Sequence, residues 1–186
     1  MDIVFRIDDV SPNTDMHELA KQMAIMKPHA STILLGVNLI ARTAQSGALY
    51  PDLPLRSKDR LYFYEADRLM GSDLIDELKS LPKVKLASHG LLHGDHSRFG
   101  KDAVEMSILT SCALLNTRIF IPPFNETSET VKIVCKDNNI EIIGNCENRI
   151  WKSLESEPFD PAHKFWYYHP WRLNLEQFKK AMMVPV

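Results

Sequence analysis

Two adjacent carboxylates, Asp8 and Asp9, stand at the end of the first apolar run of the chain, residues 3–7. Neighbouring side chains at the end of an extended segment point in different directions. One carboxylate can therefore bind a metal ion while the other accepts a proton, which is the chemistry of a metal-assisted hydrolase. The alternative at this point is that both are solvated turn residues or helix caps.

A dense histidine cluster, His89-Gly90-Leu91-Leu92-His93-Gly94-Asp95-His96, follows another apolar run. His89 and His93 have i, i+4 spacing, so one helical turn would place both rings on one side. Neutral imidazoles at that spacing are good zinc ligands, and we predict a metal site here. We expect Asp95 and His96 to support the ligands from behind, the alternative being that they are ordinary loop residues.

A stiff turn, Ile121-Pro122-Pro123-Phe124-Asn125-Glu126, follows the next apolar run. The two prolines restrict the backbone and remove two amide donors. The amides of Phe124 and Asn125 are therefore left to face a ligand, and we expect Asn125 and Glu126 to contact the substrate. A plain strand-to-helix turn is the alternative.

The last strand-like run ends in Tyr168-His169-Pro170-Trp171-Arg172. A histidine among aromatic residues suits a general acid beside a sugar, because aromatic rings offer flat apolar faces. We expect His169 to act as the acid and Trp171 and Arg172 to contact the substrate. A structural role for His169 is the alternative.

Strand-like and helix-like stretches alternate along the chain and would carry these four segments. The strand-like runs are apolar on both faces, which is typical of a parallel sheet covered by helices. The alternation predicts an α/β fold. Because only about six strands are visible, we predict a distorted, incomplete (β/α) barrel with fewer than eight strands, the alternative being an open doubly wound parallel sheet. The predicted strands are residues 3–7, 32–40, 84–87, 118–121, 140–143 and 165–168; the predicted helices are residues 16–26, 73–80, 104–115, 131–137 and 175–182.

Composition and charge narrow the class of protein. With 186 residues and no repeat or linker, we expect a single domain over residues 1–186. Lys and Arg number 22 against 24 Asp and Glu, so nothing favours a nucleic-acid partner. No apolar run is long enough for a transmembrane helix.

The three cysteines, Cys112, Cys135 and Cys146, form no CxxC pair. We interpret them as small apolar residues, with a metal-ligating or catalytic thiol as the alternative. The first residues do not resemble a secretory signal, and together these features predict a cytoplasmic protein.

The four segments together resemble the motifs of the polysaccharide deacetylase superfamily, carbohydrate esterase family four, whose members share a nodulation-type deacetylase domain. Arg6-Ile7-Asp8-Asp9-Val10 matches the strand followed by two acids, and Pro123-Phe124 matches the Pro-aromatic turn. His89-Gly90-Leu91-Leu92-His93 matches His-(Ser/Thr)-x-x-His, with Gly90 in the Ser/Thr place. Tyr168-His169 matches the apolar residue before the last histidine.

The resemblance implies a distorted (β/α) barrel that holds one divalent metal ion, with zinc the first choice. It implies that the metal ligands are Asp9, His89 and His93. The proton acceptor would be Asp8, the proton donor would be His169, and the amide of Phe124 would help to hold the oxyanion.

Two features depart from the family pattern. Phe120 or Ile121 stands where the family usually has an arginine that orients the base, so Asp8 would need another partner, such as Arg172 or Arg6. The family's acid-acid-Trp motif has no clear counterpart, since neither Arg149-Ile150-Trp151 nor the region of Asp160 fits it well.

The function that we predict is metal-dependent removal of an acetyl group from an N-acetylated sugar or glycan. By resemblance, the setting would be bacterial surface-glycan biosynthesis, such as O-antigen or capsule. The alternatives are an inactive sugar-binding scaffold and another metal hydrolase such as a phosphoesterase. Two long polar stretches, residues 41–60 and 147–164, are expected to border the metal site and to shape substrate choice. The sequence does not indicate an oligomeric state.

Overall fold

The computed structural model describes residues 2–41, 68–144 and 149–183. Its main sheet has seven strands in the order β7-β6-β5-β2-β1-β9-β8, and every neighbouring pair is parallel. The strands are β1 (Ile3–Val10), β2 (Ala30–Val37), β5 (Val84–Ser88), β6 (Ile119–Phe120), β7 (Glu141–Ile142), β8 (Lys152–Ser153) and β9 (Phe165–Tyr168). A separate antiparallel pair joins β3 (Ile40–Ala41) to β4 (Arg68–Leu69).

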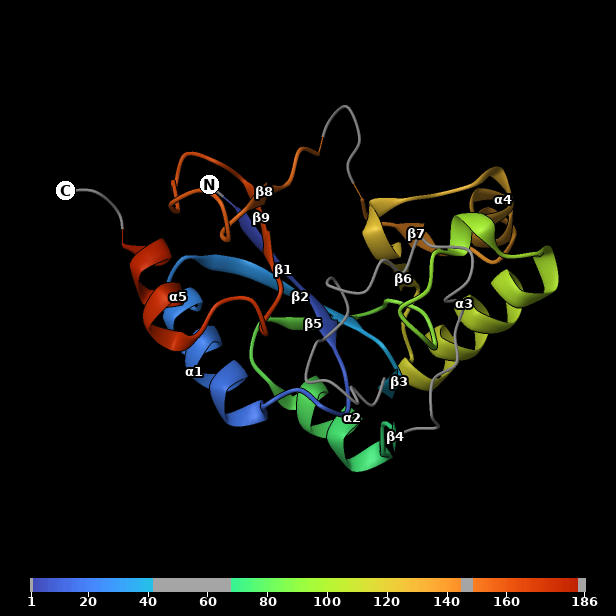
Figure 1. Cartoon of the computed structure of the whole chain (residues 1–186), viewed down its shortest axis with the longest axis horizontal. Coiled ribbons are helices and arrows are strands. Elements are labelled where there is room, and N and C mark those ends of the chain that lie inside the picture. The colour runs from blue at the N-terminus through green and yellow to red at the C-terminus, as the bar shows by residue number, and fades with distance from the viewer. Residues whose placement is uncertain (1, 42–67, 145–148, 184–186) are drawn as a thin grey trace.

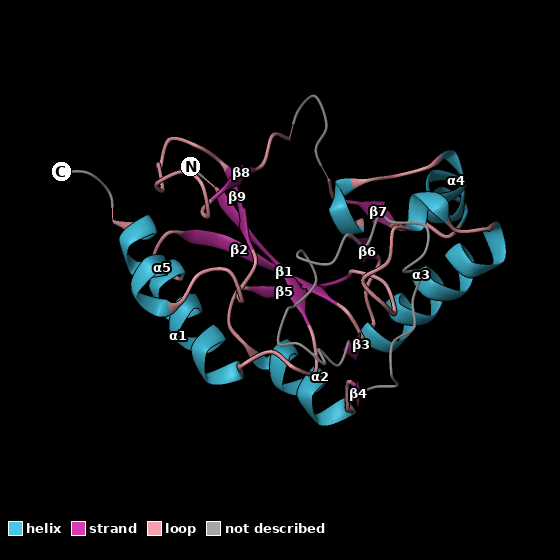
Figure 2. Ribbon diagram, viewed as in Figure 1, coloured by secondary structure: helices cyan, strands magenta, loops and turns pink. Residues whose placement is uncertain are grey.

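The helices cover the outside of this curled sheet, with α1, α2 and α5 on one flank and α3 and α4 on the other (Figures 1 and 2). They are α1 (Met16–Met26), α2 (Ser72–Ser80), α3 (Lys101–Leu115), α4 (Glu129–Asp137) and α5 (Leu175–Met182), with short 3₁₀ turns η2 (His96–Arg98) and η3 (Pro123–Asn125). The predicted incomplete α/β barrel with fewer than eight strands is therefore confirmed. The open doubly wound sheet is set aside because the sheet curls into half a barrel.

Local sequence explains where the helices begin. Asp15 caps α1 by accepting a hydrogen bond from the Glu18 amide at 3.0 Å. At α5, Asn174 and Gln177 form a capping box in which each side chain accepts a hydrogen bond from the other residue's amide. These caps satisfy amides that a helix leaves unpaired at its first turn.

The core lies between the sheet and the helices. β1 and β2 supply Phe5, Ile7, Ile33 and Leu35, each no more than 1% exposed. A second cluster around Phe120 packs between α3 and α4. Cys112 and Cys135 are free thiols in that cluster, and burial raises their pKa to about 11 and about 12.

The register of the sheet aligns the predicted functional segments at one edge. Ile7 pairs with Tyr168, so Asp8 and His169 each come directly after the last residue pair that joins β1 to β9. Ser88 pairs with Phe120, so His89 and Ile121 leave β5 and β6 together. The carboxyl ends of parallel strands thus bring all four segments to the same side of the half-barrel.

Two sequence-based expectations need correction. The six predicted strands are present, but the second is Ala30–Val37 rather than residues 32–40, and the structure adds β8 and the β3–β4 pair. β8 was missed because its two residues, Lys152 and Ser153, carry no apolar pattern. The predicted helical turn after His89 was also wrong, because Gly90 has φ +91° and residues 89–95 follow an irregular path.

Candidate metal centre and acid–base groups

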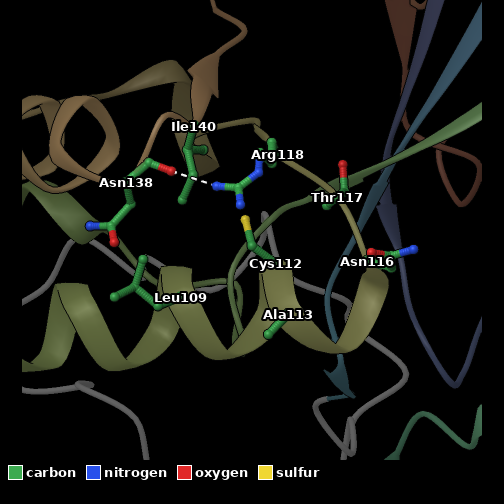
Figure 3. A pocket seen from close by; sticks show the side chains of 8 residues that line it. All are labelled: Leu109, Cys112, Ala113, Asn116, Thr117, Arg118, Asn138 and Ile140. Carbon is green, nitrogen blue, oxygen red and sulfur yellow. Dashed lines mark hydrogen bonds between the residues drawn. The ribbon is translucent and has the colours of Figure 1, made fainter.

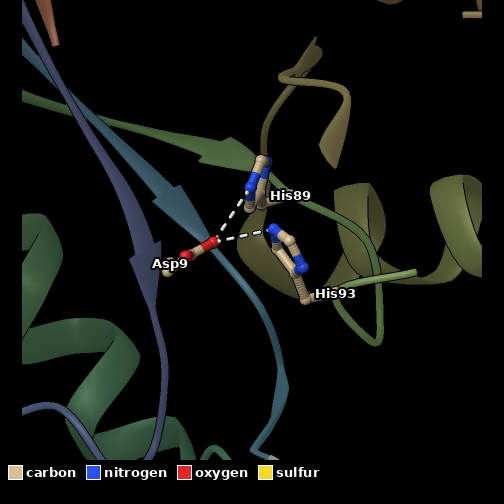
Figure 4. A group of neighbouring side chains, drawn as sticks. All are labelled: Asp9, His89 and His93. Carbon is tan, nitrogen blue, oxygen red and sulfur yellow. Dashed lines mark ion pairs between the residues drawn. The ribbon is translucent and has the colours of Figure 1, made fainter. Parts of the chain in front are cut away.

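Asp9, His89 and His93 converge on one point at the carboxyl edge of the sheet (Figure 4). The Oδ1 atom of Asp9 lies 3.2 Å from Nε2 of His89 and 3.0 Å from Nε2 of His93. All three residues are buried, at 3%, 2% and 6% exposure. Residues from two distant segments therefore place three possible ligand atoms within 4.8 Å of one another.

The backbone of β1 turns Asp9 toward the histidines. Asp9 has φ +63°, in the left-handed region that residues with a Cβ rarely adopt. Asp8 keeps the extended backbone of the strand, so the side chains of Asp8 and Asp9 point in different directions. Backbone strain of this kind persists where surrounding contacts hold it, and it is concentrated at functional sites.

Neighbouring groups fix the orientation of His89. Its Nδ1 atom lies 2.7 Å from the carbonyl oxygen of Ile121, which can only accept, so Nδ1 carries the hydrogen. That leaves the Nε2 lone pair directed at Asp9. Asn38 donates from Nδ2 to the carbonyl of His89 at 2.6 Å and anchors the backbone of the same residue.

Trp171 holds the other oxygen of Asp9. Its indole Nε1 donates to Oδ2 at 3.1 Å, which leaves Oδ1 for the histidine side. Burial by itself raises the pKa of Asp9, but the imidazoles of His93 and His89 beside it lower that pKa well below its ordinary value. The structure thus shows Trp171 orienting Asp9, and its predicted contact with the substrate stays a prediction.

The donor set fits a divalent metal ion. One carboxylate oxygen and two imidazole nitrogens are the ligands of a catalytic zinc site that retains an open position. Oδ1 of Asp9 is buried without a hydrogen-bond partner of adequate geometry among the described residues, although Nε2 of both imidazoles lies within 3.2 Å of it. A bound cation would satisfy this oxygen and both Nε2 lone pairs at once.

Asp8 forms a buried ion pair with Arg6. The Nη2 atom of Arg6 lies 2.8 Å from Oδ2 of Asp8, and the two side chains are 0% and 4% exposed. The guanidinium also lies over the rings of Trp151 and Tyr167, at 4.8 and 5.1 Å from their centroids. Of the two arginines considered for this role, Arg6 contacts Asp8 and Arg172 contacts another carboxylate.

That other carboxylate is Glu155, which holds His169. Nδ1 of His169 lies 2.5 Å from Oε1 of Glu155, and the His169 amide donates to the same oxygen at 2.7 Å. Arg172 contacts Oε2 at 3.2 Å. With Nδ1 committed to Glu155, Nε2 of His169 faces the centre, 3.9 Å from Oδ2 of Asp9.

The contact between Glu155 and His169 shifts the pKa of both residues. Burial acts to lower the pKa of His169, but the hydrogen bond to Glu155 and the charges of Asp9 and Asp8 raise it above its ordinary value. Burial acts to raise the pKa of Glu155, but the hydrogen bonds and charge of His169 lower it. The contact therefore favours the imidazolium form of His169 together with the carboxylate form of Glu155, and an imidazolium carries a proton on Nε2 as well as on Nδ1.

The turn at η3 brings Phe124 to the metal ligands. Phe124 and Asn125 have φ +60° and +56°, and the Phe124 ring meets the His93 ring edge-on with centroids 4.7 Å apart. Asn125 and Glu126 are partly buried just beyond it. The predicted role of the Phe124 amide stays a prediction, as do substrate contacts by Asn125 and Glu126.

Asp95 and His96 follow the candidate ligands on the same loop, and both are buried. Asp95 caps η2 by accepting from the Ser97 amide and pairs with Arg98 at 3.0 Å. His96 is fully buried and contacts Gly94 and Ser107. These contacts lie within the loop and with α3, and the predicted support of the ligands by Asp95 and His96 stays a prediction.

Two cavities show where ligands have access. One of about 230 Å³ reaches Asp9 and Trp171 between α1 and the segment after β9. Another, of about 270 Å³, lies at the amino end of β6, where Arg118 donates to the Asn138 carbonyl at 2.8 Å (Figure 3). The second lies at the opposite end of the strand from the metal ligands and shares none of the candidate site residues.

Sequence reasoning missed Glu155 as a functional residue and left Arg6 as one of two options. Glu155 falls in the stretch 147–164, which was expected to border the metal site but offered no motif. Of the other stretch, 41–60, only Ala41 is described. The signal for Arg6 in the sequence is its place inside an otherwise apolar strand. A charged side chain in such a place is rarely buried without a partner.

Within the described ranges, no helix combines the length and apolarity needed to cross a membrane. No protein-family model matches the sequence, and no curated protein sequence matches it either.

Solved structures share the fold. A family 4 carbohydrate esterase from Streptomyces lividans, in complex with acetate, superposes with a TM-score of 0.60 at 10% identity, covering 97% of this chain and 83% of that one. The peptidoglycan deacetylase PdaC from Bacillus subtilis gives 0.58 at 9% identity, covering 97% and 79%.

A CE4 family pseudoenzyme from Bacillus anthracis is also similar, with a TM-score of 0.57 at 12% identity over 96% of this chain. This chain spans 57% of the length of that pseudoenzyme. The resemblance read from the four motifs is thus confirmed at the level of the fold. The chain has the polysaccharide deacetylase fold seen in structures of carbohydrate esterase family four.

Proposed function

We propose that this protein is a metal-dependent hydrolase that removes an acetyl group from an N-acetylated sugar or glycan. The observation that carries the proposal is the convergence of Asp9, His89 and His93, with His169 and Asp8 beside them, on a deacetylase fold. We propose zinc as the metal, because the nitrogen-rich donor set suits it.

The metal would be held by Asp9 Oδ1 and by Nε2 of His89 and His93. Such an ion supplies a water of lowered pKa, about 7 in known zinc sites, and polarises the carbonyl that is attacked. The other steps fall to residues of this chain.

Asp8 is suited to accept the proton of the attacking water. Arg6 occupies its Oδ2 atom, while its Oδ1 atom is buried with no hydrogen-bond partner among the described residues. Gly36 faces this oxygen, and a Cβ there would come within 3.2 Å of it. Oδ1 is therefore the oxygen free to take a proton, and such a base is worth about 10²–10⁴-fold in rate.

His169 is suited to donate a proton to the departing amine from Nε2. Glu155 fixes the ring by accepting from Nδ1, and this hydrogen bond raises the pKa of His169 and so favours its protonated form. The amide of Phe124 is proposed to donate to the oxyanion. One such donor is typically worth about 2.7–4 kcal/mol of transition-state stabilisation.

The setting that we propose is bacterial surface-glycan biosynthesis, such as O-antigen or capsule, in the cytoplasm. A neighbour named as a peptidoglycan deacetylase supports a glycan of the bacterial surface. The free thiols of Cys112 and Cys135 are compatible with a reducing compartment.

The experiment is acetate release by the zinc-loaded protein from a panel of N-acetylated sugars, with O-acetylated sugars as a second panel. His93→Ala is the control, because it should lose most of its bound metal and its activity together. Release from the first panel by the unmutated protein supports the proposal. Zinc binding with no release from either panel contradicts it.

An inactive sugar-binding scaffold is the second candidate. The similarity to a CE4 family pseudoenzyme favours it, as does the absence of the arginine expected before the Pro-aromatic turn. It predicts sugar binding without acetate release. A phosphoesterase is less well supported, because the described residues contain a single group of this kind and many phosphoesterases use two metals.

A further inference from the structure

The two histidine ligands lie on a segment without regular structure. Residues 89–95 leave β5, follow bends, and re-enter regular structure only at η2. No helical hydrogen-bond ladder therefore fixes the spacing of His89 and His93. Their common orientation toward Asp9 must come from contacts that hold the backbone of this segment.

Serine hydroxyls provide two of those contacts. The amide of Gly90 donates to Oγ of Ser88 at 3.1 Å, and the amide of Leu91 donates to Oγ of Ser107 at 3.1 Å. These are the two amides directly after His89. Ser88 in turn hydrogen bonds to Ser111, with their Oγ atoms 2.5 Å apart.

The two serines of α3 stand one helical turn apart on its buried face. Ser107 is 7% exposed and Ser111 is 0% exposed. The Ser111 hydroxyl donates to the carbonyl of Ser107 at 2.6 Å, so Ser88 donates to Ser111 while accepting from Gly90. Every hydroxyl in this chain of contacts thus has both a donor and an acceptor.

His96 closes the network on the other side of the loop. Its Nδ1 lies 2.8 Å from the Gly94 carbonyl and its Nε2 lies 2.8 Å from Oγ of Ser107. Since a carbonyl can only accept, Nδ1 carries the hydrogen and Nε2 accepts from Ser107. Burial lowers the pKa of His96 to about 4, in agreement with this neutral form.

The fit of His96 explains the glycine at position 90. A Cβ on Gly90 would lie 2.6 Å from Cε1 of His96 and 2.8 Å from the Leu92 carbonyl oxygen. Gly90 also has φ +91°, which side chains disfavour. A serine or threonine at this position is therefore incompatible with the ring that braces the loop.

We propose that a serine–histidine brace positions His89 and His93 for the metal. The brace consists of Ser88, Ser107, Ser111 and His96. The proposal rests on the proposed metal site. These residues are positioning residues, since none of them contacts a reacting atom. Their hydrogen bonds fix the backbone that carries both ligands, as outer contacts of metal ligands commonly do.

The test is the zinc dissociation constant of Ser107→Ala, measured by competition with a chromophoric chelator. The loss of one acceptor for Leu91 and one donor for His96 should raise that constant about tenfold or more. Ser107→Cys keeps a side chain of similar size with a weak hydrogen-bonding group. Its zinc dissociation constant should therefore lie between those of the unmutated protein and Ser107→Ala. A constant within twofold of the unmutated protein in Ser107→Ala overturns the proposal.

Two controls separate positioning from general stability. Val104→Ala removes a buried side chain from the same helix, so it should lower the unfolding midpoint but leave the zinc constant unchanged. Thr110→Ala changes an exposed hydroxyl of α3 and should change neither. If Val104→Ala weakens zinc as much as Ser107→Ala does, the effect is global and the proposal fails.

Ser111→Ala is the second variant in case Ser107→Ala does not fold. It acts through Ser88, so a smaller rise of the zinc constant, above twofold, is expected. An unmutated protein that binds zinc but releases no acetate contradicts the proposed activity and leaves the brace intact. An unmutated protein that binds no zinc overturns both.

Discussion

Asp8 and Asp9 are chemically identical neighbours with different surroundings. Asp9 lies against two imidazoles and an indole, while Asp8 lies against a guanidinium. The backbone turn at Asp9, with φ +63°, sends the two carboxylates to different partners. At the scale of single residues, the environment rather than the residue type is the basis on which we propose Asp9 as a ligand and Asp8 as the base.

Exchanging each carboxylate for an amide should separate these roles. Asp9→Asn should weaken zinc binding, because an amide oxygen is a poorer ligand than a carboxylate. Asp8→Asn should keep the zinc and lower acetate release by about 10²–10⁴-fold, the usual worth of a general base. Zinc content and acetate release measured on the same samples distinguish the two, and equal zinc loss in both would contradict the assignment.

Glu155 should set the alkaline limit of the reaction. A proton donor works only when protonated, so activity should fall as the pH rises through the raised pKa of His169. In Glu155→Gln the raising hydrogen bond and charge are weakened, and the alkaline limb of the kcat profile should move to lower pH. Glu157→Gln, at an exposed surface pair, should leave the limb in place. An unmoved limb in Glu155→Gln would argue against this coupling.

At the scale of elements, strand β1 carries much of the chemistry by itself. Arg6 and Asp8 lie two residues apart and therefore share one face of the strand, which lets them pair. The proposed acid, His169, follows β9, and its partner Glu155 lies just after β8. On β1, Arg6 contacts the proposed base, Asp8, in a chain that lacks the arginine expected before the Pro-aromatic turn.

The Arg6–Asp8 pair should show strong coupling in a double-mutant cycle. Arg6→Gln should lower the free energy of unfolding by about 3–5 kcal/mol, because it leaves a buried carboxylate without its partner. Adding Asp8→Asn should cost much less than the sum of the single changes. Chemical denaturation of the four proteins measures the coupling.

The exposed Lys152–Glu157 pair provides the matched comparison for that cycle. Its atoms lie 3.1 Å apart, but the side chains are 36% and 47% exposed. Water weakens such pairs, so its coupling should stay below about 1 kcal/mol. Coupling free energies of similar size at both pairs would contradict our inference that burial strengthens the Arg6–Asp8 pair.

At the scale of the whole molecule, the site exists only because the half-barrel is folded. Asp9 comes from β1 and the two histidines from the segment after β5, and β2 lies between those strands. An unfolded chain has no such cluster. Zinc should therefore bind the folded state in preference to the unfolded state and stabilise it.

Thermal unfolding should report this linkage. Free zinc at 100 times its dissociation constant should add about 2.7 kcal/mol to the free energy of unfolding. For a chain of this size that corresponds to a rise of roughly 5–10 °C in Tm. His93→Ala should show almost no rise under the same conditions. A similar rise in both proteins would place the zinc elsewhere.

The sequence by itself determined the fold class and the edge of the sheet at which the candidate site residues lie. Apolar runs that alternate with amphipathic stretches specify strands and helices locally, and parallel strands share one functional edge. Because Asp8-Asp9, His89, His93, Phe124 and His169 each come within five residues of the end of such a run, their position at that edge could be predicted from the chain alone.

The tertiary structure decided what surrounds those residues. Glu155 meets His169 from fourteen positions away, and Ser107 braces a loop sixteen positions earlier, through contacts that no local pattern encodes. The helical turn expected after His89 failed because Gly90 makes room for a ring that only the folded chain brings there. Trp171 became a partner of Asp9 for the same reason, since side-chain contacts between distant segments depend on packing and register rather than on local periodicity.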